Sequence, residues 1–101
     1  APSEGTKFVF TSNHETKTSV TQFAYGKLEP GEKIAPHRHA SMEEFYYFVS
    51  GNGEFVIDNK AYPVTNGSFI RVPAQAEHRL AVKGEEAVEF VYFGAAVTQQ
   101  Q

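Results

Sequence analysis

Residues 31–51, GEKIAPHRHASMEEFYYFVSG, decide how this sequence is interpreted. His37 and His39 are two residues apart, so on an extended strand both imidazoles leave the same face. Glu44 follows five residues later, at the start of an aromatic and β-branched run. Imidazole and carboxylate groups are ligands of divalent transition metals, and His78 is the obvious candidate for one further ligand. The stretch therefore predicts a small β-barrel that holds one metal ion.

Short runs typical of strands alternate with turn residues along the chain. No window shows a convincing helical period, and turn signals at this spacing are typical of an all-β sandwich or barrel. We expect a single domain over residues 1–101, with loose ends at residues 1–7 and 98–101. The expected strands are residues 8–10, 20–28, 34–39, 44–49, 54–57, 61–64, 69–72, 78–82 and 88–93.

Composition excludes several classes of function. The net charge of -3 gives no basic field for nucleic acid, and no apolar stretch approaches the roughly 20 residues that span a bilayer. The chain has no cysteine, which excludes disulfides, thiolate ligands and thiol nucleophiles. His14 lies in a polar turn region and is expected to be solvated. The cytoplasm is the default location, although a start at Ala1 also fits a cleaved signal peptide.

The stretch 31–51 resembles the first motif of the cupin superfamily. That motif is Gly, five residues, His-x-His, three or four residues, Glu, six residues and Gly. Gly31, His37, His39, Glu44 and Gly51 meet every position.

Residues 67–82 resemble the second cupin motif. That motif is Gly, five residues, Pro-x-Gly, two residues, His, three residues and Asn. Gly67, Pro73 and His78 fit it, whereas Gln75 replaces the usual Gly and Val82 the usual Asn. The chain is identified by these motifs as a small single-domain cupin.

The resemblance implies a double-stranded β-helix, or jelly roll, with His37, His39, Glu44 and His78 around one divalent metal. A cupin that keeps these residues without a metal is the alternative, but the converging groups would then include an unpaired, partly buried charge. Three nitrogens and one oxygen suit Fe, Mn, Ni, Co, Cu or Zn. Glu43 points to the opposite face from Glu44 and is interpreted as a solvated charge.

Two further aromatic residues are expected near the metal. Tyr46 and Phe48 share the parity of Glu44 and could line the same cavity. Tyr46 could donate a hydrogen bond or act as a general acid, or it could simply fill the barrel. Arg71 is a candidate contact for an anion, but its neighbours Ile70 and Val72 are the residues whose side chains are expected to point inward. Arg38 is expected to face solvent.

The first function hypothesis is a metal-dependent enzyme of dioxygenase, isomerase, lyase or decarboxylase type that acts on a small oxygenated substrate. The metal would supply Lewis-acid or oxygen-activating chemistry. A small-molecule binding or sensing module is the second hypothesis, and a non-catalytic metal-stabilised dimer is the third. A homodimer is expected because residues 45–49 and 88–93 are apolar on both faces or nearly so.

Overall fold

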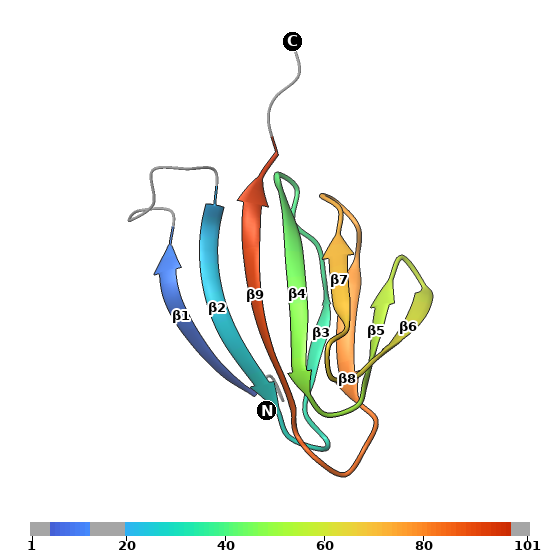
Figure 1. Cartoon of the computed structure of the whole chain (residues 1–101). Coiled ribbons are helices and arrows are strands. Elements are labelled where there is room, and N and C mark those ends of the chain that lie inside the picture. Colours follow the sequence, from blue (N-terminus) through green and yellow to red (C-terminus); the bar gives the residue numbers. More distant parts are fainter. Residues whose placement is uncertain (1–4, 13–19, 98–101) are drawn as a thin grey trace.

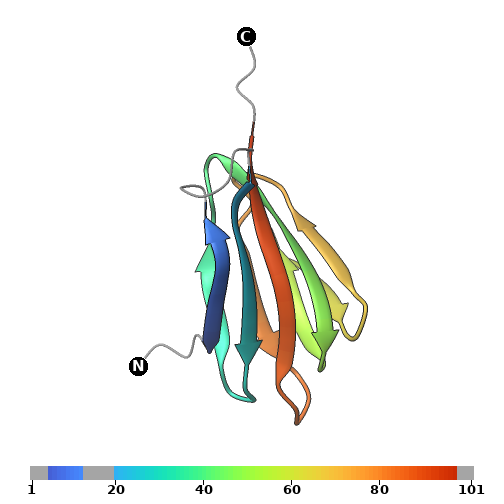
Figure 2. The same cartoon turned by 60° about the vertical axis from the view of Figure 1, so that its left-hand side comes forward.

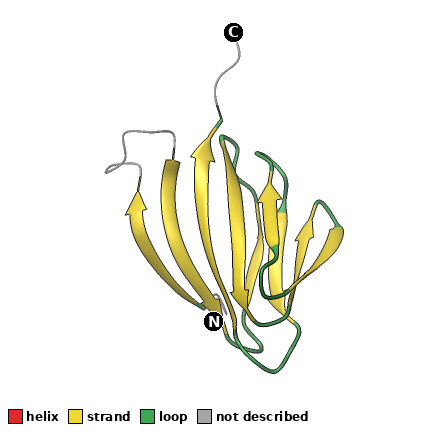
Figure 3. Cartoon of the chain, viewed as in Figure 1, coloured by secondary structure: helices red, strands yellow, loops and turns green. Residues whose placement is uncertain are grey.

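The computed structural model describes residues 5–12 and 20–97, and these residues form nine antiparallel strands (Figure 1). The described part of the chain consists of strands and loops, without a helix (Figure 3). It accordingly offers no helix that is long and apolar enough to span a membrane. The prediction of an all-β fold is confirmed.

The strands divide into two sheets. One sheet has five strands in the order β1-β2-β9-β4-β7, and the other has four in the order β3-β8-β5-β6. The strand bounds are β1 (Thr6–Ser12), β2 (Val20–Leu28), β3 (Lys33–His37), β4 (Met42–Ser50), β5 (Gly53–Ile57), β6 (Lys60–Val64), β7 (Phe69–Val72), β8 (His78–Val82) and β9 (Val88–Ala96).

The two sheets lie face to face as the layers of a jelly roll (Figure 2). Their facing sides enclose a core that is rich in aromatic rings, because alternate residues of each strand point inward. On β4, for example, Glu44, Tyr46 and Phe48 are buried while Phe45 and Tyr47 lie on the outer face. The largest fully buried side chains are Phe48, Phe55, Phe90, Leu28, Leu80, Val72 and Val88.

Several strand bounds differ from those expected. Thr6 and Lys7 belong to β1 and not to a loose arm, because they pair with Lys27 and Gly26 of β2. Pairing uses backbone groups, so the polar side chains do not prevent it. The third strand ends at His37, whereas β9 continues to Ala96 between two partner strands. His14 and the tail at residues 98–101 lie outside the described residues.

Two positions of the motifs adopt a left-handed backbone conformation. Gly51 has φ 94°, and a Cβ there would lie 2.3 Å from the Ala87 carbonyl oxygen, so only glycine fits. Gln75, where the cupin motif has glycine, has φ 70°. Its backbone N–H donates to the carbonyl oxygen of His39 over 2.6 Å. The loop therefore keeps the glycine conformation with a non-glycine residue, at a steric cost of about 1–2 kcal/mol.

Candidate metal centre

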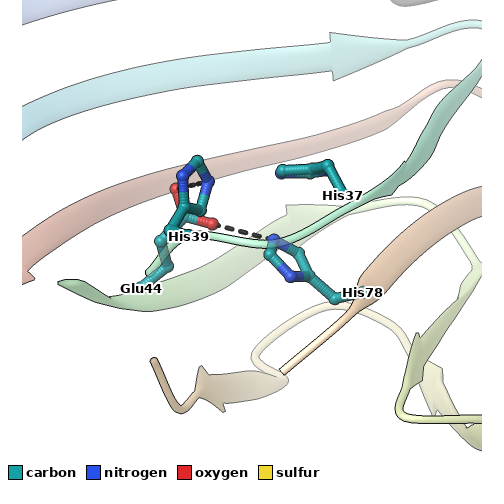
Figure 4. Close-up of side chains that lie close together, drawn as sticks. All are labelled: His37, His39, Glu44 and His78. Atoms are coloured by element: carbon teal, nitrogen blue, oxygen red, sulfur yellow. Dashed lines mark hydrogen bonds and ion pairs between the residues drawn. The ribbon is translucent and has the colours of Figure 1, made fainter. Parts of the chain in front are cut away.

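Four side chains that could ligate a metal, three of them from strands of the two sheets, converge at one end of the core (Figure 4). His37 ends β3 and His78 begins β8, and their Cα atoms are partners across these neighbouring strands. His39 lies in the connection between β3 and β4. Glu44 comes from β4, in the opposite five-stranded sheet. The hydrogen-bonding pattern of the strands thus brings together residues that are up to 41 positions apart in the sequence.

The candidate ligand atoms are close enough to share one ion. One ligand atom from each of the four residues can be chosen so that all lie within 4.8 Å of one another. The imidazole centroid of His37 lies 4.1 Å from that of His78 and 5.0 Å from that of His39. Such a set of three imidazoles and one carboxylate suits a divalent transition metal.

Glu44 is 3% exposed and carries its carboxylate into this buried end of the core. Its Oε1 accepts a hydrogen bond from the Tyr46 hydroxyl over 2.7 Å and lies 3.0 Å from Nε2 of His78. Burial raises the pKa of the carboxyl, but the hydrogen bonds of His78 and Tyr46 and the charges of His39 and His78 lower it by more. The pKa of Glu44 therefore lies below its ordinary value, and the group is an anion at neutral pH.

The backbone sets the tautomer of two of the histidines. Nδ1 of His78 lies 3.1 Å from the Ala76 carbonyl oxygen, and Nδ1 of His37 lies 3.0 Å from that of Ala35. A carbonyl oxygen only accepts, so each Nδ1 carries the proton and each Nε2 of a neutral ring has a lone pair. In a neutral His78 this lone pair would face a carboxylate oxygen at 3.0 Å, whereas in a protonated His78 the same nitrogen donates its hydrogen bond to Glu44. The two acceptors repel each other unless a proton or a metal ion lies between them.

His39 provides the second observation that fits a metal. Its Nε2 is buried without a hydrogen-bond partner among the described residues, and it lies 3.4 Å from Oε2 of Glu44. Burial lowers the pKa of His39, and the charges of His37, His78 and Lys7 lower it further, against the opposing effect of Glu44. A neutral imidazole with an unsatisfied nitrogen beside an anion is ready to bind a cation. The four residues therefore fit a divalent metal ion.

The cluster opens into a cavity of about 370 Å³. The cavity lies between the inner face of β2, β9 and β4 and the strand β3, and β1 contributes to its edge. Lys7 and Gln22 add polar groups to a lining that is otherwise largely apolar and aromatic. Burial, followed by the charge of Glu44, raises the pKa of Tyr92 to about 12. The lining residues are Gly5, Thr6, Lys7, Gln22, Gly26, Ile34, Ala35, Pro36, His37, His39, Glu44, Tyr46, Phe90 and Tyr92.

The remaining residues singled out from the sequence have different positions. Tyr46 lines the cavity beside Glu44, and burial, the Glu44 charge and their hydrogen bond raise its pKa well above 10.0. Phe48 is fully buried in the core and does not line the cavity. Arg38 is exposed, as expected. Arg71 lies on the outer face, where its guanidinium donates to Glu43 over 2.8 Å, so Glu43 is ion-paired and not merely solvated.

Lys7 and Gln22 are the cavity residues that sequence reasoning missed. The only sequence signal for Lys7 is that it alternates with Phe8 and Phe10 and so shares a strand face with Val9. The strand is too short for this alternation to be a reliable pattern. Lys7 pairs with Gly26, and both residues line the cavity. The register of β1 on β2 places it there, and that register is a tertiary property.

Comparison with known proteins agrees with this architecture. Dimethylsulfoniopropionate lyase DddW of Ruegeria pomeroyi is 36% identical over 63 residues, which cover 62% of this chain and 40% of that protein. An oxalate-binding protein of Thermotoga maritima is 30% identical over 69 residues, covering 68% of this chain and 57% of that protein. The chain thus spans only part of the length of both relatives.

A solved structure shares the fold over most of the chain. The crystal structure of a predicted oxalate decarboxylase from Thermotoga maritima superposes with a TM-score of 0.85 and 24% identity, covering 90% of this chain and 79% of that one. The family model described as a cupin domain matches residues 24–94, which include all four candidate metal ligands. The chain therefore belongs to the cupin domain family.

Proposed function

We propose that this protein is a metal-dependent enzyme of dioxygenase, isomerase, lyase or decarboxylase type, acting on a small oxygenated organic acid. The observation that carries the proposal is the cluster of His37, His39, Glu44 and His78, of which the first three line a cavity of about 370 Å³. A partly buried cluster of this kind, open to a pocket of small-molecule size, is the usual layout of a metal-dependent active site.

A transition metal bound there would supply Lewis-acid or redox chemistry at an oxygen of the ligand. The side chains of the protein have separate tasks. The Ala35 and Ala76 carbonyl oxygens orient the rings of His37 and His78. Tyr46 holds the Glu44 carboxylate through a 2.7 Å hydrogen bond. Aromatic walls limit the amount of water around the ligand, which strengthens electrostatic interactions inside the cavity.

The class of ligand follows from the polar groups at the cavity edge. The Lys7 ammonium offers a positive charge, and Gln22 offers amide donors, on walls that otherwise suit an apolar or planar body. A carboxylate can pair with Lys7 while another oxygen of the same molecule faces the histidine cluster. Oxalate and dimethylsulfoniopropionate, which the names of the two relatives contain, are both small carboxylates.

The experiment that tests the proposal begins with elemental analysis of protein purified from its native host. The protein loaded with that metal is then assayed for turnover of oxalate and of small keto acids and hydroxyaromatic acids. Lys7→Met should raise KM, since it removes only the charge at the cavity edge. Lys27→Met is the matched control, because Lys27 pairs with Glu29 and does not line the cavity. A Lys7→Met variant with unchanged KM for every acid turned over would contradict the assigned ligand class.

A non-catalytic binding module is the second candidate. The hydroxyl of Tyr46 is committed to Glu44, and the pKa values of both cavity tyrosines are raised, so neither is poised for proton transfer near neutral pH. Binding of an acid to the metal-loaded protein without turnover would support this candidate. We also propose that the protein works as a homodimer with one metal centre in each subunit.

A further inference from the structure

Six phenylalanine rings form a continuous row across the outer face of the five-stranded sheet, with at least one ring on every strand. We call this row the phenylalanine band. Neighbouring ring centroids along it lie 5.1, 5.4, 6.2, 4.8 and 6.2 Å apart. In this order its members are Phe8, Phe10, Phe23, Phe93, Phe45 and Phe69.

The band is large enough to act as the centre of an interface. Phe8, Phe10, Phe23 and Phe69 are 59%, 54%, 41% and 60% exposed, and Tyr47, the cross-strand partner of Phe69, is 48% exposed. With ~200 Å² for a whole aromatic side chain, these five expose roughly 500 Å². A stable dimer buries about 800 Å² on each partner. The band and Tyr47 together therefore supply more than half of that area, and the surrounding sheet can supply the remainder.

The charges beside the band favour a second copy of this chain as the partner. Arg71 is neutralised by Glu43 over 2.8 Å, and Glu89 accepts the Tyr25 hydroxyl hydrogen bond over 2.8 Å. In a two-fold interface the same face meets itself, so uncompensated like charges close to the axis would repel their own copies. The pairing of these groups within one chain removes much of that repulsion. An apolar row that reaches both edges of the sheet is also complementary to itself.

The band is connected to the cavity through β1. Phe8 belongs to the band, and Lys7, the preceding residue, points to the opposite side of the strand and lines the cavity. The side chains of residues 6–10 are all exposed, and β1 is an edge strand that pairs with β2 alone among the described strands. Contacts on Phe8 and Phe10 would therefore add packing that this strand lacks within one subunit.

We propose that two copies of this chain pack band against band around a two-fold axis, and that this contact holds β1 so that Lys7 stays over the metal cavity. The second half of this inference rests on the proposed function, because it gives Lys7 a ligand to contact. Dimerisation is then part of the formation of the ligand site and not only a cover for apolar surface.

Two substitutions test the interface. Phe23→Glu and Phe69→Glu each add a charge at an exposed position of the band, and either should weaken the dimer roughly 30- to 100-fold. Val97→Glu is the matched control, because Val97 is 46% exposed and lies outside the band. Sedimentation velocity at micromolar concentration should give twice the chain mass of 11.2 kDa for the parent and the control, and the chain mass for both band variants. A monomeric parent, or band variants that remain dimeric, would overturn the interface.

The link to Lys7 has a readout that needs no ligand. Hydrogen exchange of the backbone amides of residues 6–9 should become roughly tenfold faster in the monomeric variants, because β1 loses its outer packing. Unchanged exchange in a proven monomer would refute the coupling. Oxalate binding to the metal-loaded protein, measured by calorimetry, should weaken in the same variants. If the dimer and the exchange results hold but the parent binds no oxalate, the interface stands and the proposed ligand fails.

Discussion

Replacement of Tyr46 by phenylalanine removes one oxygen atom beside the metal centre and leaves the ring in place. The Tyr46 hydroxyl donates to Oε1 of Glu44 over 2.7 Å inside the core. The ring packs against Phe55 and Tyr92, with centroids 4.9 and 5.1 Å away, and these contacts persist in Tyr46→Phe. The substitution therefore isolates the hydroxyl, and its effect is expected on Glu44.

The size of the effect follows from the charge of the acceptor. A hydrogen bond to a charged group contributes about 1.5–3 kcal/mol. Loss of a hydrogen-bond partner behind a metal ligand typically reduces metal affinity about 10- to 100-fold. We expect Tyr46→Phe to bind metal within that range of weakening, because Glu44 loses the donor that orients its carboxylate.

The assay is a competition titration of Zn²⁺ between the protein and a chromophoric chelator at neutral pH. Tyr92→Phe is the matched control, since Tyr92 lines the same cavity but its hydroxyl makes no hydrogen bond to Glu44 in the described structure. Its affinity should stay close to that of the parent. An unchanged affinity in Tyr46→Phe would refute the positioning role. If that variant kept its affinity and lost turnover, Tyr46 would act as a general acid instead.

Four further predictions concern the same region. His37→Ala and His78→Ala should each reduce bound metal by at least about tenfold in elemental analysis, and unchanged content in both would reject the ligand assignment. Metal affinity should fall as the pH drops below about 6, because protons compete with the metal for the imidazoles. The lowered pKa values of His39 and Glu44 keep these two groups in their ligating form down to that range. A metal affinity that does not change with pH would contradict histidine ligation. Removal of the metal with a chelator should abolish any turnover, and Glu44→Gln should reduce it. Turnover that survives both changes would arise outside this site. Gln75→Gly should raise the free energy of unfolding by about 0.5–1 kcal/mol in urea, and a lower free energy of unfolding would contradict a steric cost at the Gln75 φ of 70°.

The sequence predicted those parts of the structure that depend on local periodicity and spacing. Alternation along β4 placed Glu44, Tyr46 and Phe48 on one face, and the structure buries all three. The resemblance to the two cupin motifs implied three histidines and one carboxylate around one metal, and the structure brings their ligand atoms within 4.8 Å of one another. Parity suffices for the shared face within β4, whereas only the resemblance related His78 to the first motif, because these residues meet through tertiary structure.

Features that depend on register and side-chain rotamers were not predictable in this way. Lys7 reaches the cavity only because β1 pairs with β2 in one particular register. The ion pair between Arg71 and Glu43 forms because β7 lies beside β4, with Arg71 opposite Phe45. The core position of Phe48 depends on where the cavity ends and the packed interior begins. These relations involve residues far apart in the sequence, and a pattern within one strand does not contain them.

The origin of the four ligands in both sheets makes the candidate ion a cross-link between them. His37 and His78 belong to the four-stranded sheet, and Glu44 belongs to the five-stranded sheet. Bound metal would therefore stabilise the association of the layers by RT ln(1 + [M]/Kd), which is about 4 kcal/mol at a free metal concentration 1,000 times the Kd. The midpoint temperature of thermal unfolding would then vary with the free concentration of the metal. In metal-poor cells the two sheets would separate at a lower temperature than in metal-replete cells.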